Sequence, residues 1–411
     1  MSELKKGMGI TVLQAARERI RYAFDHFEAI YVSFSAGKDS SVMLHLVMEE
    51  SIRRNRKVGV LLIDLEAQYT LTIKHAEQMF SLYREHIEPY WVCLPIKLRN
   101  AVSNYEPVWC AWDPERRADW VREFPQFDGV ITDPKYFDFF EPRMEFEEFI
   151  ELFAVWYSRG RTTAAFIGIR ADESLNRFRT IAIWDKGMHF GKRYTTEIIP
   201  GVYNFYPIYD WNVRDIWRYH AHFPDKPHNE VYDRMHLAGV SLAQMRLCQP
   251  YGDDQKRGLW LYHLIEPKTW GKLIARVNGA NSGALYIEEH GNVNGYNKVA
   301  LPPGHTWKSF CNLLLSTMPK VTRDHYIERF NSWLVGWHKR GYRNGIPDIA
   351  PRELEIKPWV PSWHRLCKCL LRNDWWCKGL GMQQPKSAAY EKYLNIRRQN
   401  RLAKSSEAEA A

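Results

Sequence analysis

The sequence predicts a doubly wound α/β domain with a mainly parallel sheet, followed by a mostly helical C-terminal domain. Short apolar runs with the composition of buried strands recur between residues 30 and 169. Segments of helical periodicity separate these runs, and strands that alternate with helices indicate βαβ units. The residues after about 225 carry different patterns, including an aromatic helix.

Length and composition limit the number of domains and the class of protein. The chain has 411 residues, which is enough for two or three domains, and its 45% hydrophobic content supports a core. No apolar run approaches the ~18 residues of a membrane helix, and the N-terminus lacks a signal-peptide core. We therefore expect a cytoplasmic protein without membrane contact.

The net charge of +9 suits either a nucleic acid or a polyanionic nucleotide. The basic residues are spread out, with local clusters at 53–57, 339–343 and 397–401, and no helix-turn-helix or zinc-finger pattern occurs. Direct nucleic-acid binding therefore stays open, but a solvated surface is favoured.

Residues 29–48 read as a strand, a tight loop and a helix. The run Ile30–Phe34 predicts a buried strand, and helical spacing resumes at Val42. Gly37 lets the backbone approach a ligand, the helix N-terminus favours an anion, and Lys38 adds a cation on what we expect to be a surface loop. The predicted nucleotide-binding residues here are Ser33, Phe34, Ser35, Ala36, Gly37, Lys38, Asp39, Ser40 and Ser41.

The next elements follow in order. A helix at 11–28 precedes the first strand, and a second strand, Val58–Ile63, ends at Asp64. Because ligands in open α/β sheets bind beyond the carboxyl ends of the strands, we expect Asp64 and Glu66 beside the loop. The alternative for Asp64 is a turn or cap residue. Further on we expect a helix at 70–86 with Thr70 as its cap, a strand at Tyr90–Leu94, an irregular insertion or lid at 100–142, a helix at 143–159 and a strand at Ala164–Ile169.

Two more segments bear on the site. In the first, which runs from Gly168 to Arg177, Arg170 and Arg177 could clamp a phosphate or sulfate group, with Glu173 orienting one of them. The alternative is a surface salt-bridge cluster. In the second, at 206–217, Asp210 or Asn212 caps a helix that faces the core with Val213, Ile216 and Trp217.

These motifs resemble a known family. The loop SAGKDSS is similar to the S-x-G-K-D-S pyrophosphate loop of the adenine-nucleotide alpha-hydrolases, with Ala36 where glycine is usual, and it differs from a Walker A loop. GIRADESLNR resembles the G-x-R-x-x-E-S-x-x-R element of phosphoadenosine phosphosulfate (PAPS) reductases. YPIYDWNVRDIW resembles their P-I-x-D-W-x-x-x-D-V-W element. All three occur in the family's order, over residues 29–220.

The resemblance to this family, part of the N-type ATP pyrophosphatase superfamily, implies ATP or PAPS as substrate. It implies catalytic roles for Lys38, Asp39, Asp64, Arg170 and Arg177, with Mg²⁺ held by Asp39 or Asp64. No iron–sulfur cluster is expected, because no two cysteines are adjacent or in C-x-x-C spacing. The E-C-G-L-H element with the redox thiol of the reductases is also missing from the sequence.

The C-terminal part resembles the extension of a bacterial and phage group of PAPS reductase-like or sulfotransferase-like proteins, which often accompany a ParB/sulfiredoxin-like partner. We expect a nucleotide-binding domain at 1–225, the helical domain at 226–385 and a charged, disordered tail at 386–411. Cys248 is either a buried or pocket-wall residue or a catalytic thiol. His364, Cys367, Cys369 and Cys377 could close a zinc site, but core thiols fit the spacing better.

Three functions follow from the sequence. The first is adenylylation of an acceptor by ATP with release of pyrophosphate. The second is PAPS-dependent reduction or sulfonate transfer, through Cys248 or an external thiol. The third is nucleotide sensing without turnover, together with a ParB-like partner.

Overall fold

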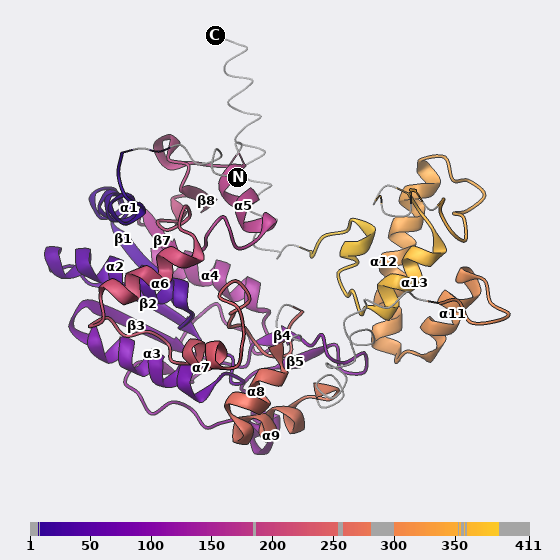
Figure 1. Ribbon diagram of the computed structural model, residues 1–411, viewed down its shortest axis with the longest axis horizontal. Coiled ribbons are helices and arrows are strands. Elements are labelled where there is room, and N and C mark those ends of the chain that lie inside the picture. Colours follow the sequence, from indigo (N-terminus) through magenta and orange to yellow (C-terminus); the bar gives the residue numbers. More distant parts are fainter. Residues whose placement is uncertain are drawn as a thin grey trace, which may run out of the picture.

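The computed structural model describes residues 7, 9–183, 186–253, 258–280, 300–351, 353–354, 357 and 360–385 (Figure 1). In these residues one sheet has seven strands in the order β6-β3-β2-β1-β7-β9-β8. All its pairings are parallel except that of β8 with β9, which confirms the predicted mainly parallel sheet. The strands are β1 Ala29–Ser33, β2 Val58–Ile63, β3 Ile87–Val92, β6 Val130–Ile131, β7 Thr163–Ile167, β8 Thr195–Ile199 and β9 Val202–Phe205.

Helices cover both faces of the sheet, as a doubly wound fold requires. Neighbouring residues of a strand point to opposite faces, and Tyr90 and Trp91 are neighbours in β3. Tyr90 contacts Phe153 of α4, whereas Trp91 contacts Phe80 of α3. The helices of this part are α1 Val12–His26, α2 Lys38–Arg54, α3 Thr70–Leu82, α4 Phe146–Ser158, α5 Leu175–Ala182, α6 Val213–His222 and α7 Val231–Leu237, with short 3-10 turns η1 Arg84–His86, η2 Pro114–Asp119 and η3 His189–Gly191.

The caps of two helices test predictions made from the sequence. Asn212, not Asp210, caps α6, and it forms a reciprocal capping box with Asp215. The expectation for Thr70 was wrong, because Thr70 is the first residue of α3 and not its cap. The carboxylate of Glu266 accepts the N–H of Thr70 at 2.9 Å instead. A side chain distant in the sequence thus replaces the local cap.

The insertion at 100–142 is more ordered than its sequence suggests. It contributes β5 (Val108–Cys110), which pairs antiparallel with β4 (Lys97–Arg99) to form a hairpin. Trp109, Trp112 and Trp120 are buried in the main hydrophobic core. In Figure 1 the hairpin lies between the sheet and the C-terminal helices.

The remaining helices form two groups. The residues of α8 (Trp260–Ile265) and α9 (Pro267–Arg276) join the main core, whose buried residues continue to Ala280. A second core holds α11 (Trp307–Thr317), α12 (Lys320–Lys339), α13 (Trp363–Leu371) and the 3-10 turn η5 (Lys378–Leu380). The C-terminal part is thus mostly helical. The domain boundary near 225 stays a prediction, and the expected tail at 386–411 lies outside the described residues.

Cys367, Cys369 and Cys377 are buried in this second core. In the part of the chain that the structure describes, no group of three or more metal-ligating side chains could hold an ion. Nor does that part contain a helix long and apolar enough to cross a membrane.

Three buried histidines make the stability of the fold depend on pH. Burial lowers the pKa of His45 to about 4 and those of His75 and His220 to about 3. The unfolded chain, with an ordinary histidine pKa of about 6.5, therefore binds protons that the folded chain does not. We expect the free energy of unfolding to be largest, as far as these histidines contribute, above about pH 6.5 and to fall as the pH drops toward 4.

Urea unfolding over this pH range measures the effect. Both ring nitrogens of His220 are buried without a hydrogen-bond partner, so His220→Leu should reduce the slope of stability against pH. His26→Gln, which changes an exposed histidine, is the control. Equal slopes in wild type and His220→Leu would contradict the prediction.

Candidate functional site

The loop between β1 and α2 is shaped by its own backbone and hydroxyl groups. Gly37 is the N-cap of α2 and offers no side-chain cap, so the first N–H groups of the helix depend on other partners. The hydroxyls of Ser40 and Ser41 donate to the Gly37 carbonyl at 3.1 and 2.9 Å. Ser35 and Ser40 also share a hydrogen bond of 3.0 Å between their hydroxyls. The loop is therefore tightly fixed.

Ala36 stands in a left-handed conformation, with φ of 54°. This backbone region costs an alanine roughly 1–2 kcal/mol but is open to glycine. We expect Ala36→Gly to be tolerated, with the free energy of unfolding unchanged or raised by up to about 1 kcal/mol, since the added freedom of the unfolded chain offsets part of the gain. Urea unfolding measures this, and a loss of more than about 1 kcal/mol would show that the alanine methyl is needed.

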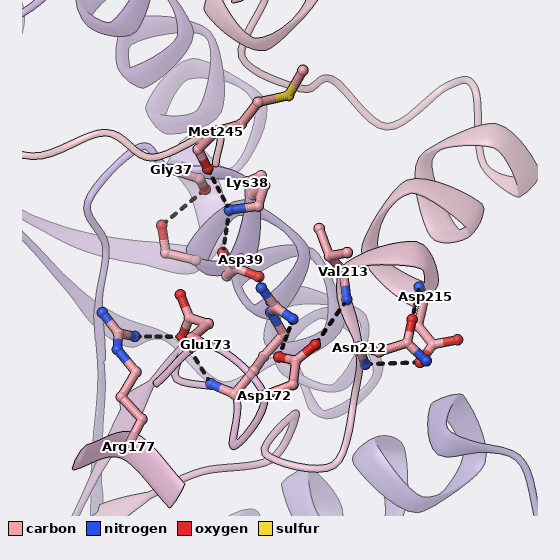
Figure 2. A network of polar contacts seen from close by, with 12 residues as sticks. Gly37, Lys38, Asp39, Asp172, Glu173, Arg177, Asn212, Val213, Asp215 and Met245 are labelled. Atoms are coloured by element: carbon pink, nitrogen blue, oxygen red, sulfur yellow. Dashed lines mark hydrogen bonds and ion pairs between the residues drawn. The ribbon is translucent and has the colours of Figure 1, made fainter. Parts of the chain in front are cut away.

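A chain of alternating charges links the loop to the segment after β7, and Figure 2 shows it. Lys38 Nζ lies 3.0 Å from Asp39 Oδ2. The other oxygen of Asp39 accepts a hydrogen bond from Arg170, which also donates to Asp172. Asp172 in turn accepts the Val213 N–H at the start of α6, at 3.3 Å. Asp39 and Arg170 are thus brought together from positions 131 residues apart.

Glu173 orients the side chain of Arg177 and holds the backbone, not the guanidinium, of Arg170. Its Oε2 accepts Arg177 Nη1 at 2.6 Å and the Arg170 backbone N–H at 3.1 Å. A side chain at Gly168 would come within 3.2 Å of the Ser40 backbone nitrogen, so glycine allows the end of β7 to lie against the first turn of α2. The motif after β7 and the loop therefore form one site.

Residues 229–248, the covering segment, lie over the loop. The Lys38 N–H donates to the Tyr232 hydroxyl at 3.1 Å, and Lys38 Nζ donates to the Met245 carbonyl at 3.1 Å. Asn229 donates to the Ala36 carbonyl at 2.9 Å. Lys38 is only 5% exposed, which corrects our expectation of a surface loop: the covering segment encloses it.

Two cavities meet at this loop. The smaller, of about 250 Å³, is bordered by Gly37, Lys38, Asp39, Ser40 and Gly168 among others. The larger, of about 890 Å³, runs from Ser33, Phe34 and Ser35 toward the hairpin and α12. The residues that border both are Ser33, Ser35, Arg177, Leu247 and Cys248. Cys248 is exposed, whereas the other six cysteines are buried.

Asp64 and Glu66 lie elsewhere, since neither borders either cavity. Asp64 is 1% exposed; it accepts Trp91 Nε1 at 2.9 Å and pairs with Arg122. Glu66 is fully buried against Arg276, with the closest atoms 2.7 Å apart. The structure therefore does not bring Asp64 beside Asp39, and both acids hold other segments on the sheet.

Sequence reasoning missed several residues around the loop. Asp172 lies inside a motif we identified but matches no fixed position of it. Tyr232 and Met245 contact Lys38 from about 200 positions away, as their separations of 194 and 207 residues show. No local pattern in the sequence marks either one.

Comparison with known proteins shows which family the chain belongs to. The model of the phosphoadenosine phosphosulfate reductase domain matches residues 137–238, and that of a domain of unknown function (DUF3440) matches residues 239–358. The uncharacterized protein YbdN of Escherichia coli (strain K12) is 41% identical over 396 residues, which cover 96% of each chain. The chain belongs to the PAPS reductase-like family. Its reductase match includes Arg170, Glu173 and Arg177 but begins after the phosphate loop.

Solved structures give weaker likenesses. The PAPS reductase of Candida auris is 13% identical, with a TM-score of 0.27, over 53% of this chain and 84% of its own. The FMN adenylyltransferase of Candida glabrata is 14% identical, with a TM-score of 0.33, over 54% of this chain and 59% of its own. The NMN synthetase of Francisella tularensis is 11% identical, with a TM-score of 0.30, over 72% of this chain and 100% of its own. At these values none of them bears on the function of this family member.

Proposed function

We propose that this protein binds ATP at the phosphate loop and transfers the adenylyl group to an acceptor, with release of pyrophosphate. The convergence of Lys38, Asp39 and the N-terminus of α2 on one cavity carries the proposal. A helix N-terminus and a lysine are the groups that hold phosphate oxygens. Family membership supports the coarser statement that the protein is a nucleotide-binding enzyme.

In this proposal each residue has one task. Lys38 leaves Met245 and binds the β- and γ-phosphates, which become the leaving group. Arg177, which borders both cavities, faces the charge that develops on the α-phosphate. A nucleophilic atom of the acceptor attacks the α-phosphorus, the bond from this phosphorus to the bridging oxygen breaks, and pyrophosphate leaves with the electron pair. Arg170 keeps Asp39 in place.

Mg²⁺ fits this site in part. Proteins bind Mg²⁺ through one or two carboxylates together with substrate phosphates and water. Asp39 borders the smaller cavity and satisfies this requirement, whereas the enclosed Asp64 does not. We therefore propose Asp39 as the protein ligand, with Mg²⁺ supplying charge neutralisation on the phosphates.

Cys248 favours a second candidate, sulfonate transfer from PAPS. Its position at the junction of the two cavities would let its thiolate attack the sulfonate sulfur. The S–O bond to the nucleotide would break, and adenosine bisphosphate would leave. Reduction to sulfite would then require an external dithiol, which would become a disulfide.

Product analysis separates the candidates. The protein is incubated with ATP and with PAPS in the presence of an external dithiol, with and without a ParB/sulfiredoxin-like partner, and pyrophosphate and sulfite are followed separately. Pyrophosphate that disappears in Lys38→Ala supports adenylylation. Sulfite that disappears in Cys248→Ser would overturn it in favour of the second candidate. Tight binding with neither product would favour a nucleotide sensor.

A further inference from the structure

The far wall of the larger cavity is a fixed surface. It is built where the β4–β5 hairpin meets the second core, and Asn373 joins the two parts. Its side-chain oxygen accepts Arg99 Nη2 at 3.1 Å and the Tyr326 hydroxyl at 3.2 Å, and its Nδ2 donates to the Ala101 carbonyl at 3.2 Å. Thr322 adds a bond to the Asn104 carbonyl. The insertion therefore docks on the C-terminal helices.

Two arginines from opposite sides of this junction border the cavity. Arg99 belongs to β4 and Arg329 to α12. Arg329 donates to the carbonyls of Trp376 and Gln383 at 2.8 and 2.9 Å, and Arg99 donates to the carbonyls of Asn100 and Pro107 and to Asn373. The Nε of each arginine is buried without an acceptor.

Neither guanidinium has a carboxylate partner among the described residues. Four acidic side chains border the same cavity, but no ion pair joins them to Arg99 or Arg329; they are Glu145, Glu147, Asp253 and Glu328. Burial lowers the pKa of Arg99. Asp253 and Asp374 oppose this effect on Arg99 only from a distance, without forming an ion pair. Burial also acts to lower the pKa of Arg170 and of Arg276, but the carboxylate partners of these two arginines raise their pKa overall. A half-buried cation without an ion-pair partner is costly, so this wall is suited to an anion.

The surroundings hold the two cations in place. The ring of Trp375 lies between His325, stacked at 3.6 Å, and the Arg99 guanidinium, 4.7 Å away. Lys378 also borders the cavity. We call Arg99, Arg329 and Lys378 the basic wall. A cavity of about 890 Å³ lies near the upper end of the roughly 300–1,000 Å³ of single-ligand sites, so there is room for a nucleotide and a second molecule.

We propose that the basic wall is the binding site for the anionic end of the acceptor, a phosphate, sulfate or carboxylate group. The other end of the acceptor extends through the cavity to the phosphate loop, where it reacts. The role as acceptor site rests on the proposed adenylylation, whereas the anion site itself does not. The β4–β5 hairpin and the C-terminal helices together thus supply the second substrate site, and the loop after β1 supplies the nucleotide site.

Anomalous diffraction tests this directly. Crystals of the full chain are soaked in sodium selenate, a tetrahedral dianion, and separately in 4-bromobenzoate, a carboxylate that does not alkylate thiols. We expect a selenium or bromine peak beside Arg99 and Arg329. Selenate alone identifies a phosphate- or sulfate-type acceptor, and bromobenzoate alone identifies a carboxylate. No peak at the basic wall in either soak overturns the proposal.

Variants show whether the peak depends on the basic wall, and a second peak reports on the phosphate loop. Arg329→Gln should abolish the peak at the basic wall, whereas Arg323→Gln, on the same helix but outside the cavity lining, should retain it. Lys378→Gln should weaken the peak and serves if Arg329→Gln does not fold. A selenate peak at Lys38 reports separately on the phosphate loop. A peak at the basic wall without one at the loop would therefore support this inference and count against the proposed function.

Discussion

Replacing Glu66 with alanine is expected to lower the free energy of unfolding by about 3–5 kcal/mol. The Glu66 carboxylate accepts Arg276 Nε at 2.7 Å and Nη2 at 3.1 Å, and both side chains are at most 1% exposed. It also accepts the backbone N–H groups of Trp112 and Val121 at 2.7 and 3.0 Å. The substitution would leave a buried guanidinium without its counter-charge and two buried donors without an acceptor.

Urea unfolding followed by tryptophan fluorescence measures this loss. Glu85→Ala removes an exposed acid and should change stability by no more than about 0.5 kcal/mol. The double variant Glu66→Ala/Arg276→Met should recover part of the loss, because it also removes the unpaired charge. If Glu66→Ala were as stable as Glu85→Ala, the pair would not be what fastens α9 and the insertion to the sheet.

Lys38→Ala is expected to weaken ATP binding by about 1.5–3 kcal/mol, the usual contribution of a charge-assisted hydrogen bond. Each 1.4 kcal/mol is a factor of about ten in Kd. The fold should survive, because Asp39 keeps Arg170 as its partner when the lysine is removed. The loss should therefore appear in nucleotide affinity and not in the unfolding transition.

Isothermal titration calorimetry with ATP and Mg²⁺ measures the affinity. Lys57→Ala, which removes an exposed lysine from the turn before β2, is the matched control and should bind like the wild type. Equal affinities in Lys38→Ala and Lys57→Ala would refute the assignment of the loop as a phosphate site.

The parts of the fold that the sequence predicts are those with local causes. The second strand, Val58–Ile63, was predicted at its observed bounds because its apolar run is continuous and ends sharply. The strand predicted at Tyr90–Leu94 is observed at Ile87–Val92, since Glu88 and Pro89 obscure its beginning. The cap of α3 was missed because Glu266 supplies it from 196 positions away.

The same distinction applies to the candidate site. The loop and the motif after β7 come together as expected, because parallel strands end at one edge of the sheet. The reasoning for Asp64 and Glu66 placed them at that edge too, but it could not foresee that Arg122 and Arg276, 58 and 210 positions away, would enclose them. The covering segment and the basic wall likewise depend on contacts between distant residues.

The most direct test of the central claim is a crystal structure of the wild-type chain with a non-hydrolysable ATP analogue and Mg²⁺. We expect the β- and γ-phosphates within hydrogen-bond distance of Lys38 Nζ, with the Met245 carbonyl released and Mg²⁺ beside Asp39. An analogue bound away from the loop, with Lys38 still on Asp39 and Met245, would contradict the claim that this loop is the nucleotide site.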